Sequence, residues 1–129
     1  MITISTALNE YRLQGVMAFL AQGSEGARAE VYDGVRPVLG GAPLGKLLVA
    51  IILADPVGTV AEGVLTLTPT AEVMITATGQ ATWARTVNGE GAVAWDCDVS
   101  ELNGTGELRL PSTTLYAGGF TRIVSGVIA

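Results

Sequence analysis

The segment TWARTVNGEGAVAWDCD, residues 82–98, holds the side chains best suited to chemistry. Its Cys97, the only cysteine of the chain, stands between Asp96 and Asp98. A thiol close to paired carboxylates raises the question of an active site, and two carboxylates on one face of a strand could bind Ca²⁺. The alternative is a β-hairpin with one packed side and one wet side, because polarity alternates on both sides of a central Asn-Gly pair.

The alternation within this segment favours the hairpin. A loop of three residues, 88–90, pairs Trp83 with Trp95 and separates an apolar face from a polar one, whereas a two-residue Asn-Gly turn mixes them. The apolar face holds Trp83, Val87, Val93, Trp95, Cys97 and Val99, and the polar face holds Thr82, Ala84, Thr86, Ala94, Asp96 and Asp98. Arg85 does not fit, and we expect it to lie along a tryptophan face at the sheet edge with its guanidinium in water.

This register separates the thiol from the carboxylates. Cys97 points into the core, while Asp96 and Asp98 point to water, so the three cannot act together. A nucleophilic cysteine also needs a base, normally His, and the chain has His 0. We predict a buried structural cysteine. The two aspartates lack the six to eight oxygens that Ca²⁺ requires, so we expect a solvated sheet edge and no metal.

The absence of histidine limits enzyme chemistry in the rest of the chain. It excludes Ser-His-Asp triads and His-ligated zinc. A carboxylate pair of the glycosidase kind, or a Ser-Lys pair using the single lysine Lys46, stays open, but nothing in the sequence singles out either. The glycines at 40–41 and 58–63 lack the Gly-Lys-Ser/Thr ending of a phosphate loop and are interpreted as turns. We expect neither enzymatic activity nor a cofactor.

The composition indicates a surface shared with other subunits. The 129 residues are 49% hydrophobic, include Gly 17 and are only 15% charged, where about 25% charged is usual. So little charge is typical of a subunit that covers much of its exterior with neighbours, although a very Ala-rich genome biases composition in the same way. We favour assembly, and a homo-oligomer in particular.

The charge and hydropathy patterns argue against nucleic acid and membrane as partners. The net charge is -5 and the seven basic residues are scattered, whereas phosphate binding needs clustered Lys and Arg. The apolar run 47–54 is far shorter than the ~20 residues that cross a bilayer. The first residues, MITISTALNEYRLQ, lack the basic and apolar regions of a signal peptide, and a lone cysteine suits a reducing compartment. We expect the chain to stay in the cytoplasm where it is made.

Residues 6–22 are predicted to form an amphipathic helix. Its apolar stripe consists of Leu13, Val16, Met17 and Leu20, with Ser5 or Thr6 as N-cap and Gly23 as the stop. The stripe could serve a partner, but we favour packing on the helix's own domain, because the polar face lacks the lysines of a membrane-lying helix.

From residue 27 onward the pattern changes to short β segments separated by turn residues. The expected strands are 27–32, 47–53, 64–68, 73–78, 81–87, 92–99, 107–110, 113–116 and 121–128. Their even spacing predicts an antiparallel β-sandwich or barrel over 27–128. Together with the N-terminal helix it makes one mainly β domain, 1–129.

Several sequence segments resemble those of a group of small virion proteins of tailed bacteriophages and prophages. They are AEVYDGVRP (29–37), LADPVGTVAEGVLTL (53–67), ATGQATWARTVNGEG (77–91), DCDV (96–99) and LRLPSTTLYAGG (108–119). The family they most resemble is the head decoration, or cementing, proteins. The resemblance implies a jelly-roll-like sandwich without catalytic residues that binds between major capsid protein subunits and stabilises the shell.

This resemblance also implies a location. An acidic chain is repelled by packaged DNA, which suggests the outer capsid surface of the virion. A tail- or neck-associated virion protein is the runner-up. A host- or sugar-binding β-sandwich module is a further alternative, disfavoured because aromatic residues make up only 5% of the chain.

The candidate contact residues lie in the loop 34–43. Arg36, Pro37, Val38 and Leu39 form a largely aliphatic segment held at both ends by Gly and Pro, which makes a good anchor for a partner. The alternative is that this loop folds over its own sandwich, and the sequence leaves both interpretations open.

Overall fold

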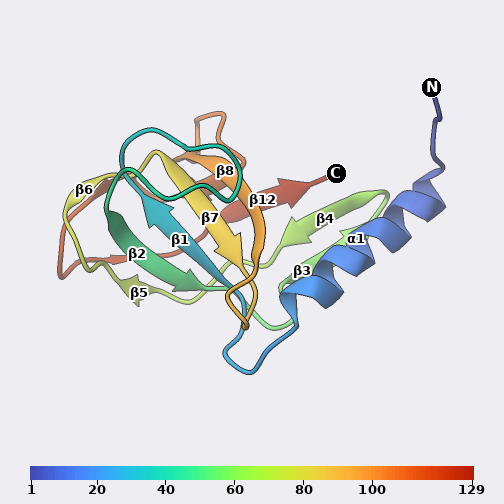
Figure 1. Cartoon of the computed structure of the whole chain (residues 1–129), viewed down its shortest axis with the longest axis horizontal. Coiled ribbons are helices and arrows are strands. Elements are labelled where there is room, and N and C mark those ends of the chain that lie inside the picture. Colours follow the sequence, from blue (N-terminus) through green and yellow to red (C-terminus); the bar gives the residue numbers. More distant parts are fainter.

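A curled sheet of eight strands dominates the computed structural model, which describes residues 1–129 (Figure 1). The strand order is β2-β1-β7-β8-β9-β12-β4-β3. The strands are β1 Arg28–Tyr32, β2 Leu47–Ile52, β3 Gly58–Ala61, β4 Val64–Leu67, β7 Trp83–Val87, β8 Val93–Glu101, β9 Leu108–Leu110 and β12 Ser125–Ile128. Two small ladders pair β5 Val73–Met74 with β11 Phe120–Thr121, and β6 Gly79–Gln80 with β10 Thr114–Leu115. The prediction of a mainly β sandwich with one N-terminal helix is confirmed.

One strand pair departs from the antiparallel pattern that we predicted. β8 and β9 run parallel, with Val99 opposite Leu108, although only residues 102–107 connect them. Parallel neighbours usually need a connection of a dozen or more residues. Two glycines allow the chain to turn back over this short distance. A Cβ on Gly104 would lie 2.5 Å from Ser100 Cβ, and a Cβ on Gly106 would lie 2.7 Å from the Ser100 amide nitrogen. The sheet is therefore mixed.

The two halves of the sheet enclose one core cluster. Alternate residues of β1, Ala29 and Val31, are fully buried in it. The other half and its connecting segments contribute Leu67, Leu108, Leu110 and Ile123. Alternation along each strand thus fills the space between the halves, as expected for strands with one buried face.

The helix α1 covers Thr6–Leu20 and begins where predicted. Ser5 is the N-cap, and its Oγ accepts a hydrogen bond of 3.1 Å from the amide of Leu8. The helix ends at Leu20 rather than at residue 22. Gly23 follows with a φ of +91°, and a Cβ there would collide with the backbone of Gly89.

Only one side of α1 packs on the body of the protein. Leu13 and Leu20 are buried, as the predicted stripe requires, and Asn9 Nδ2 donates a hydrogen bond of 2.9 Å to the Gly63 carbonyl in the β3–β4 turn. Leu8 and Tyr11, however, are exposed. The helix therefore has apolar residues on two sides and is less amphipathic than predicted. It is not long and apolar enough to cross a membrane.

Candidate interaction surface

The β7–β8 hairpin has a different register from the predicted one. Trp83 lies opposite Asp98 instead of Trp95, and a bulge interrupts the ladder between Thr86 and Val87. The turn spans residues 88–91 and is closed by a hydrogen bond of 3.0 Å from the Gly91 amide to the Asn88 carbonyl. Gly91 has a φ of +85°, which favours glycine. The shift is odd-numbered, so it moves Trp83 to the face opposite Cys97.

The part of this second face around Trp83 and Arg85 is also buried. Trp83 is fully buried and stacks on Tyr32 of β1, with ring centroids 4.6 Å apart. The Arg85 guanidinium lies 5.4 Å from the Trp83 ring centroid, so its predicted contact with a tryptophan face is confirmed. Its predicted place at a wet edge is wrong, because β7 lies between β1 and β8 in the sheet.

Arg85 is instead bound to Asp96 on the neighbouring strand. Arg85 Nε and Nη2 donate to the two carboxylate oxygens at 2.8 Å and 3.1 Å. The side chains are only 8% and 4% exposed, so the prediction that Asp96 points to water is wrong. The hydrogen bond to Asp96 raises the pKa of Arg85 above its ordinary value, because it stabilises the protonated guanidinium.

A loop covers this ion pair. We call residues 34–45, which join β1 to β2, the aliphatic loop. Its two ends are held together, because the Lys46 amide donates to Asp33 Oδ1 at 2.7 Å and the Asp33 amide donates to the Lys46 carbonyl at 3.3 Å. Gly45 is needed at this closure, since a Cβ there would lie 2.1 Å from the Asp33 carbonyl oxygen. The loop thus forms a closed excursion from the sheet.

The ion pair also holds the backbone of the aliphatic loop. Arg85 Nη2 donates to the Gly41 carbonyl at 2.7 Å, and the Gly40 amide lies 3.4 Å from Asp96 Oδ2. A turn closes between Val38 and Gly41, where the Gly41 amide donates to the Val38 carbonyl at 2.8 Å. The loop therefore does fold over its own sheet, through its backbone.

The aliphatic side chains of the same loop face solvent. Val35, Val38, Leu39 and Leu44 are 73%, 82%, 70% and 78% exposed. Among the predicted contact residues, Pro37 is half-buried, and Arg36 makes an ion pair of 3.3 Å with Asp98. The two interpretations of the loop are thus compatible, because its backbone is bound to the sheet while its apolar side chains stay uncovered.

Cys97 lies in the core, on the other face of β8. Its predicted burial is confirmed, and burial, with a smaller contribution from Glu107, raises its pKa to about 12. Asp96 and Asp98 point to the opposite face, where each is paired with an arginine. The thiol and the carboxylates are separated, as the alternation predicted.

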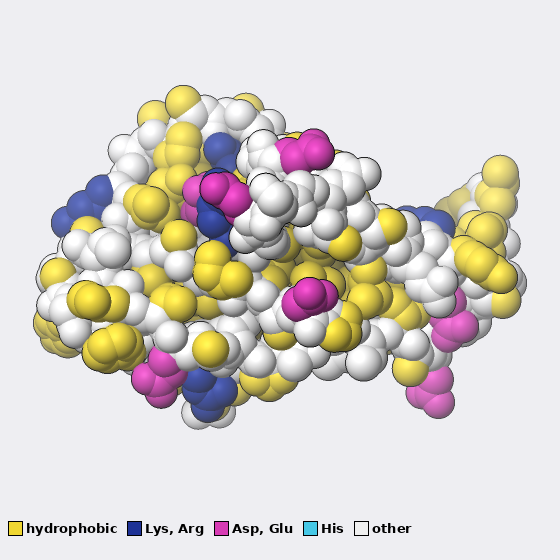
Figure 2. All heavy atoms as spheres, turned by 90° about the horizontal axis from the view of Figure 1, so that it is seen from below, with side chains coloured by type: hydrophobic (Ala, Val, Ile, Leu, Met, Phe, Trp, Pro, Cys, Tyr) yellow, Lys and Arg dark blue, Asp and Glu magenta, His cyan; other side chains and the backbone are white.

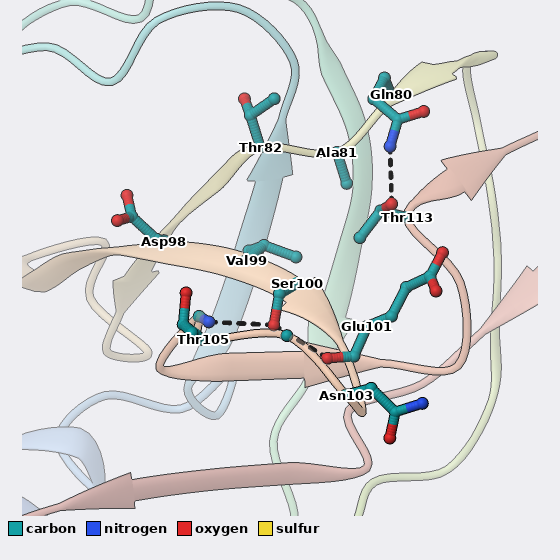
Figure 3. A pocket seen from close by; sticks show the side chains of 12 residues that line it. Gln80, Ala81, Thr82, Asp98, Val99, Ser100, Glu101, Asn103, Thr105 and Thr113 are labelled. Atoms are coloured by element: carbon teal, nitrogen blue, oxygen red, sulfur yellow. Dashed lines mark hydrogen bonds between the residues drawn. The ribbon is translucent and has the colours of Figure 1, made fainter.

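A shallow polar hollow of about 660 Å³ lies beside the end of β8 (Figure 3). Its side chains are mainly hydroxyls and amides that bind one another or nearby backbone. Gln80 Nε2 donates to Thr113 Oγ1 at 2.6 Å, and Ser100 Oγ donates to the Glu101 carbonyl at 2.9 Å. Figure 3 shows the carboxylates of Asp98 and Glu101 on opposite sides of the hollow. The arrangement offers no pair of groups directed at a common substrate atom.

The rest of the surface is also rich in apolar side chains. Figure 2 shows one face on which apolar side chains form several patches, while charged groups are few and in two places lie beside a group of opposite charge. Among the exposed large apolar side chains outside the aliphatic loop, two groups stand close together in the chain or in the sheet. One is formed by Met1, Ile2, Ile4, Leu8 and Tyr11 at the N-terminus, and the other by Met74, Tyr116 and Phe120 around the β5–β11 ladder.

Comparisons with known proteins add no family. No protein-family model matches the chain, and neither the curated proteins nor the solved structures gave a match.

Proposed function

We propose that this chain is a head decoration protein of a tailed bacteriophage, which binds between major capsid protein subunits through the aliphatic loop and stabilises the shell. One observation carries the proposal. Four exposed aliphatic side chains project from a loop whose backbone is bound to a buried Arg85–Asp96 pair. Such a loop is ordered before it meets its partner, so binding loses little conformational entropy.

The proposed activity is burial of surface rather than a reaction. Val38 and Leu39 insert between coat subunits as apolar anchors, and the weakly charged surroundings contribute shape-complementary contact area. The net charge of -5 favours the outer face of the capsid, away from the packaged DNA. The protein acts without enzymatic activity, and copies of it associate with one another on the virion.

Co-sedimentation with empty phage heads tests this proposal. The chain is added in increasing amounts to purified shells, and bound protein is measured in the pellet. A decoration protein saturates at a fixed ratio to the coat subunit. Shells that stay bare at saturating concentration would overturn the proposal and favour a tail or neck role, whose test is binding to purified tails.

Loop variants locate the contact. Val38→Ser with Leu39→Ser removes both anchors, and we expect binding to weaken at least roughly 30-fold while the melting temperature stays the same. Met74→Ser is the matched control, because Met74 is also an exposed apolar residue, 57% exposed, but lies in β5 outside the loop. Equal binding of the loop variant and the control would remove the aliphatic loop from the interface.

A further inference from the structure

The outward side of α1 carries a second apolar stripe. Leu8, Tyr11, Gly15 and Phe19 follow one another at spacings of three and four residues, so they share one face of the helix. Leu8 and Tyr11 are 50% and 75% exposed. Glu10, the one acidic residue of the helix, points to the other side, where it accepts a hydrogen bond from the Gly63 amide. The stripe therefore carries no carboxylate that would favour its exposure to water.

The stripe leads into an apolar groove of about 410 Å³ between α1 and β8. Five of its seven lining residues are hydrophobic, namely Val16, Phe19, Val93, Ala94 and Trp95. Gly15 and Arg12 complete the lining. Arg12 is bound within its own helix, where Nη1 donates to Asn9 Oδ1 at 2.8 Å. The groove is thus mainly apolar, and the one charged group in its lining, the Arg12 guanidinium, has a neutral hydrogen-bond partner and no carboxylate beside it.

The N-terminal arm, residues 1–5, has the chemistry that this groove accepts. Ile2 is 89% exposed and Ile4 is 39% exposed, and Figure 1 shows the arm pointing away from the sheet. The arm of one chain cannot fill the groove of the same chain with Ile4. Val16 lies about 15 Å along the helix from Thr6, while Ile4 is only two residues from Thr6 and reaches about 7 Å.

We infer that a second copy of the chain fills the groove, so that two copies exchange their arms around a two-fold axis. The spacing along α1 suits this arrangement, because Ile4 is seven residues before Tyr11 and Phe19 is eight residues after it. An axis passing near Tyr11 therefore brings each arm onto the partner's groove and packs the two outward stripes together. This interface leaves the aliphatic loop free, so it stands independently of capsid binding.

Sedimentation velocity on the full chain, from micromolar to millimolar concentration, tests the inference. We expect a concentration-dependent dimer. Ile2→Lys with Ile4→Lys places positive charges on the arm, which Arg12 of the groove repels, and is expected to give a monomer. Gly15→Leu is expected to give a monomer by filling the groove. A Cβ at Gly15 meets nothing within 4 Å, and leucine is the better helix former, so this variant folds with an unchanged or higher melting temperature.

Two controls make the result specific to arm exchange. Gly15→Ala adds only a methyl group and keeps the dimer. A mixture of the arm variant and the Gly15→Leu variant forms mixed dimers, because one intact arm still meets one intact groove. A wild-type chain that stays monomeric throughout, a dimer that survives both variants, or a mixture that stays monomeric beside a dimeric wild type would each overturn the inference.

Discussion

Arg85 and Asp96 face each other across β7 and β8 and form an ion pair with 2.8 Å between Nε and Oδ1, beneath the aliphatic loop. The pair joins two layers of the molecule. The strand register places the two side chains together, and Nη2, which also donates to Asp96, binds the Gly41 carbonyl of the loop above. The internal structure of the sheet and the shape of the outer surface thus depend on the same two residues.

Removing one partner of this ion pair is expected to lower the free energy of unfolding strongly. Arg85→Met leaves the Asp96 carboxylate buried without its partner, and we expect a loss of about 3–5 kcal/mol in the free energy of unfolding. Urea denaturation followed by tryptophan fluorescence measures it. Arg85→Met with Asp96→Leu removes both charges and should be clearly more stable than either single variant. Single variants within 1 kcal/mol of wild type would contradict the buried pair.

The same double variant separates loop order from fold stability. With both charges gone the sheet stays folded, but the aliphatic loop loses its hydrogen bonds to Arg85 and Asp96. We expect amide hydrogen exchange in 34–45 to become roughly tenfold faster, as the loss of one or two hydrogen bonds predicts. Exchange in β1 should change less. Unchanged exchange in the loop would mean that its stem alone keeps it ordered.

Asn88 joins the hairpin turn to the end of α1. Its Oδ1 accepts hydrogen bonds of 3.0 Å from the amides of Glu90 and Ala92, and its Nδ2 donates to the Phe19 carbonyl at 3.2 Å. The residue is fully buried. We expect Asn88→Ala to lower the free energy of unfolding by about 2–4 kcal/mol, because buried backbone groups lose their partners.

Two further variants test the role of Asn88. Asn88→Asp keeps both acceptor contacts but cannot donate to Phe19, so it should also destabilise the protein and loosen the end of the helix. Asn103→Ala is the matched control. Asn103 is exposed, and its change should stay within about 0.5 kcal/mol. Equal stability of the Asn88 and Asn103 variants in urea denaturation would refute this role.

Because Cys97 is buried, we expect the protein to lose stability at high pH. Burial raises its pKa from 9.0 to about 12. Below pH 9 the thiol is protonated in both states, so its contribution to stability is fully present. As the pH rises from 9 towards 12, only the unfolded chain ionises, and the free energy of unfolding falls by about 1.4 kcal/mol per pH unit.

The measurement compares wild type with Cys97→Ala. The variant creates a small cavity at every pH but lacks this additional slope above pH 9. Native wild type should also resist a thiol reagent at pH 8 and react only after unfolding. Rapid labelling of the native protein would show that the thiol is accessible.

Features that are set within a single strand, helix end or loop could be predicted from the sequence. Alternation correctly placed Cys97 in the core, and the N-cap Ser5 and the aliphatic character of residues 38–39 could be identified directly. The relation between β7 and β8 could not, because it depends on Gly91 in the turn and on a bulge at Thr86, and a bulge leaves no mark in the sequence. Both features alter the register, and together they changed the partner of Trp83.

The buried pair was missed for the same reason. In the sequence, Arg85 is the one charged residue on the predicted apolar face of 83–87, and this exception was the sign that it needs a buried partner. In the predicted register its opposite residue was Val93, whereas in the structure it is Asp96. A charged residue in a buried row needs a carboxylate across the ladder, and this requirement could have been used to choose the register.

The closure at Asp33 and Lys46 has a consequence for engineering. Since these two residues, with Gly45 beside them, join the ends of the excursion away from its tip, residues 38–39 at the tip are a natural place to insert a foreign peptide. Lengthening a closed loop adds only about 0.6 kcal/mol for each doubling of its length. The scaffold could thus present an epitope or an affinity tag without being redesigned.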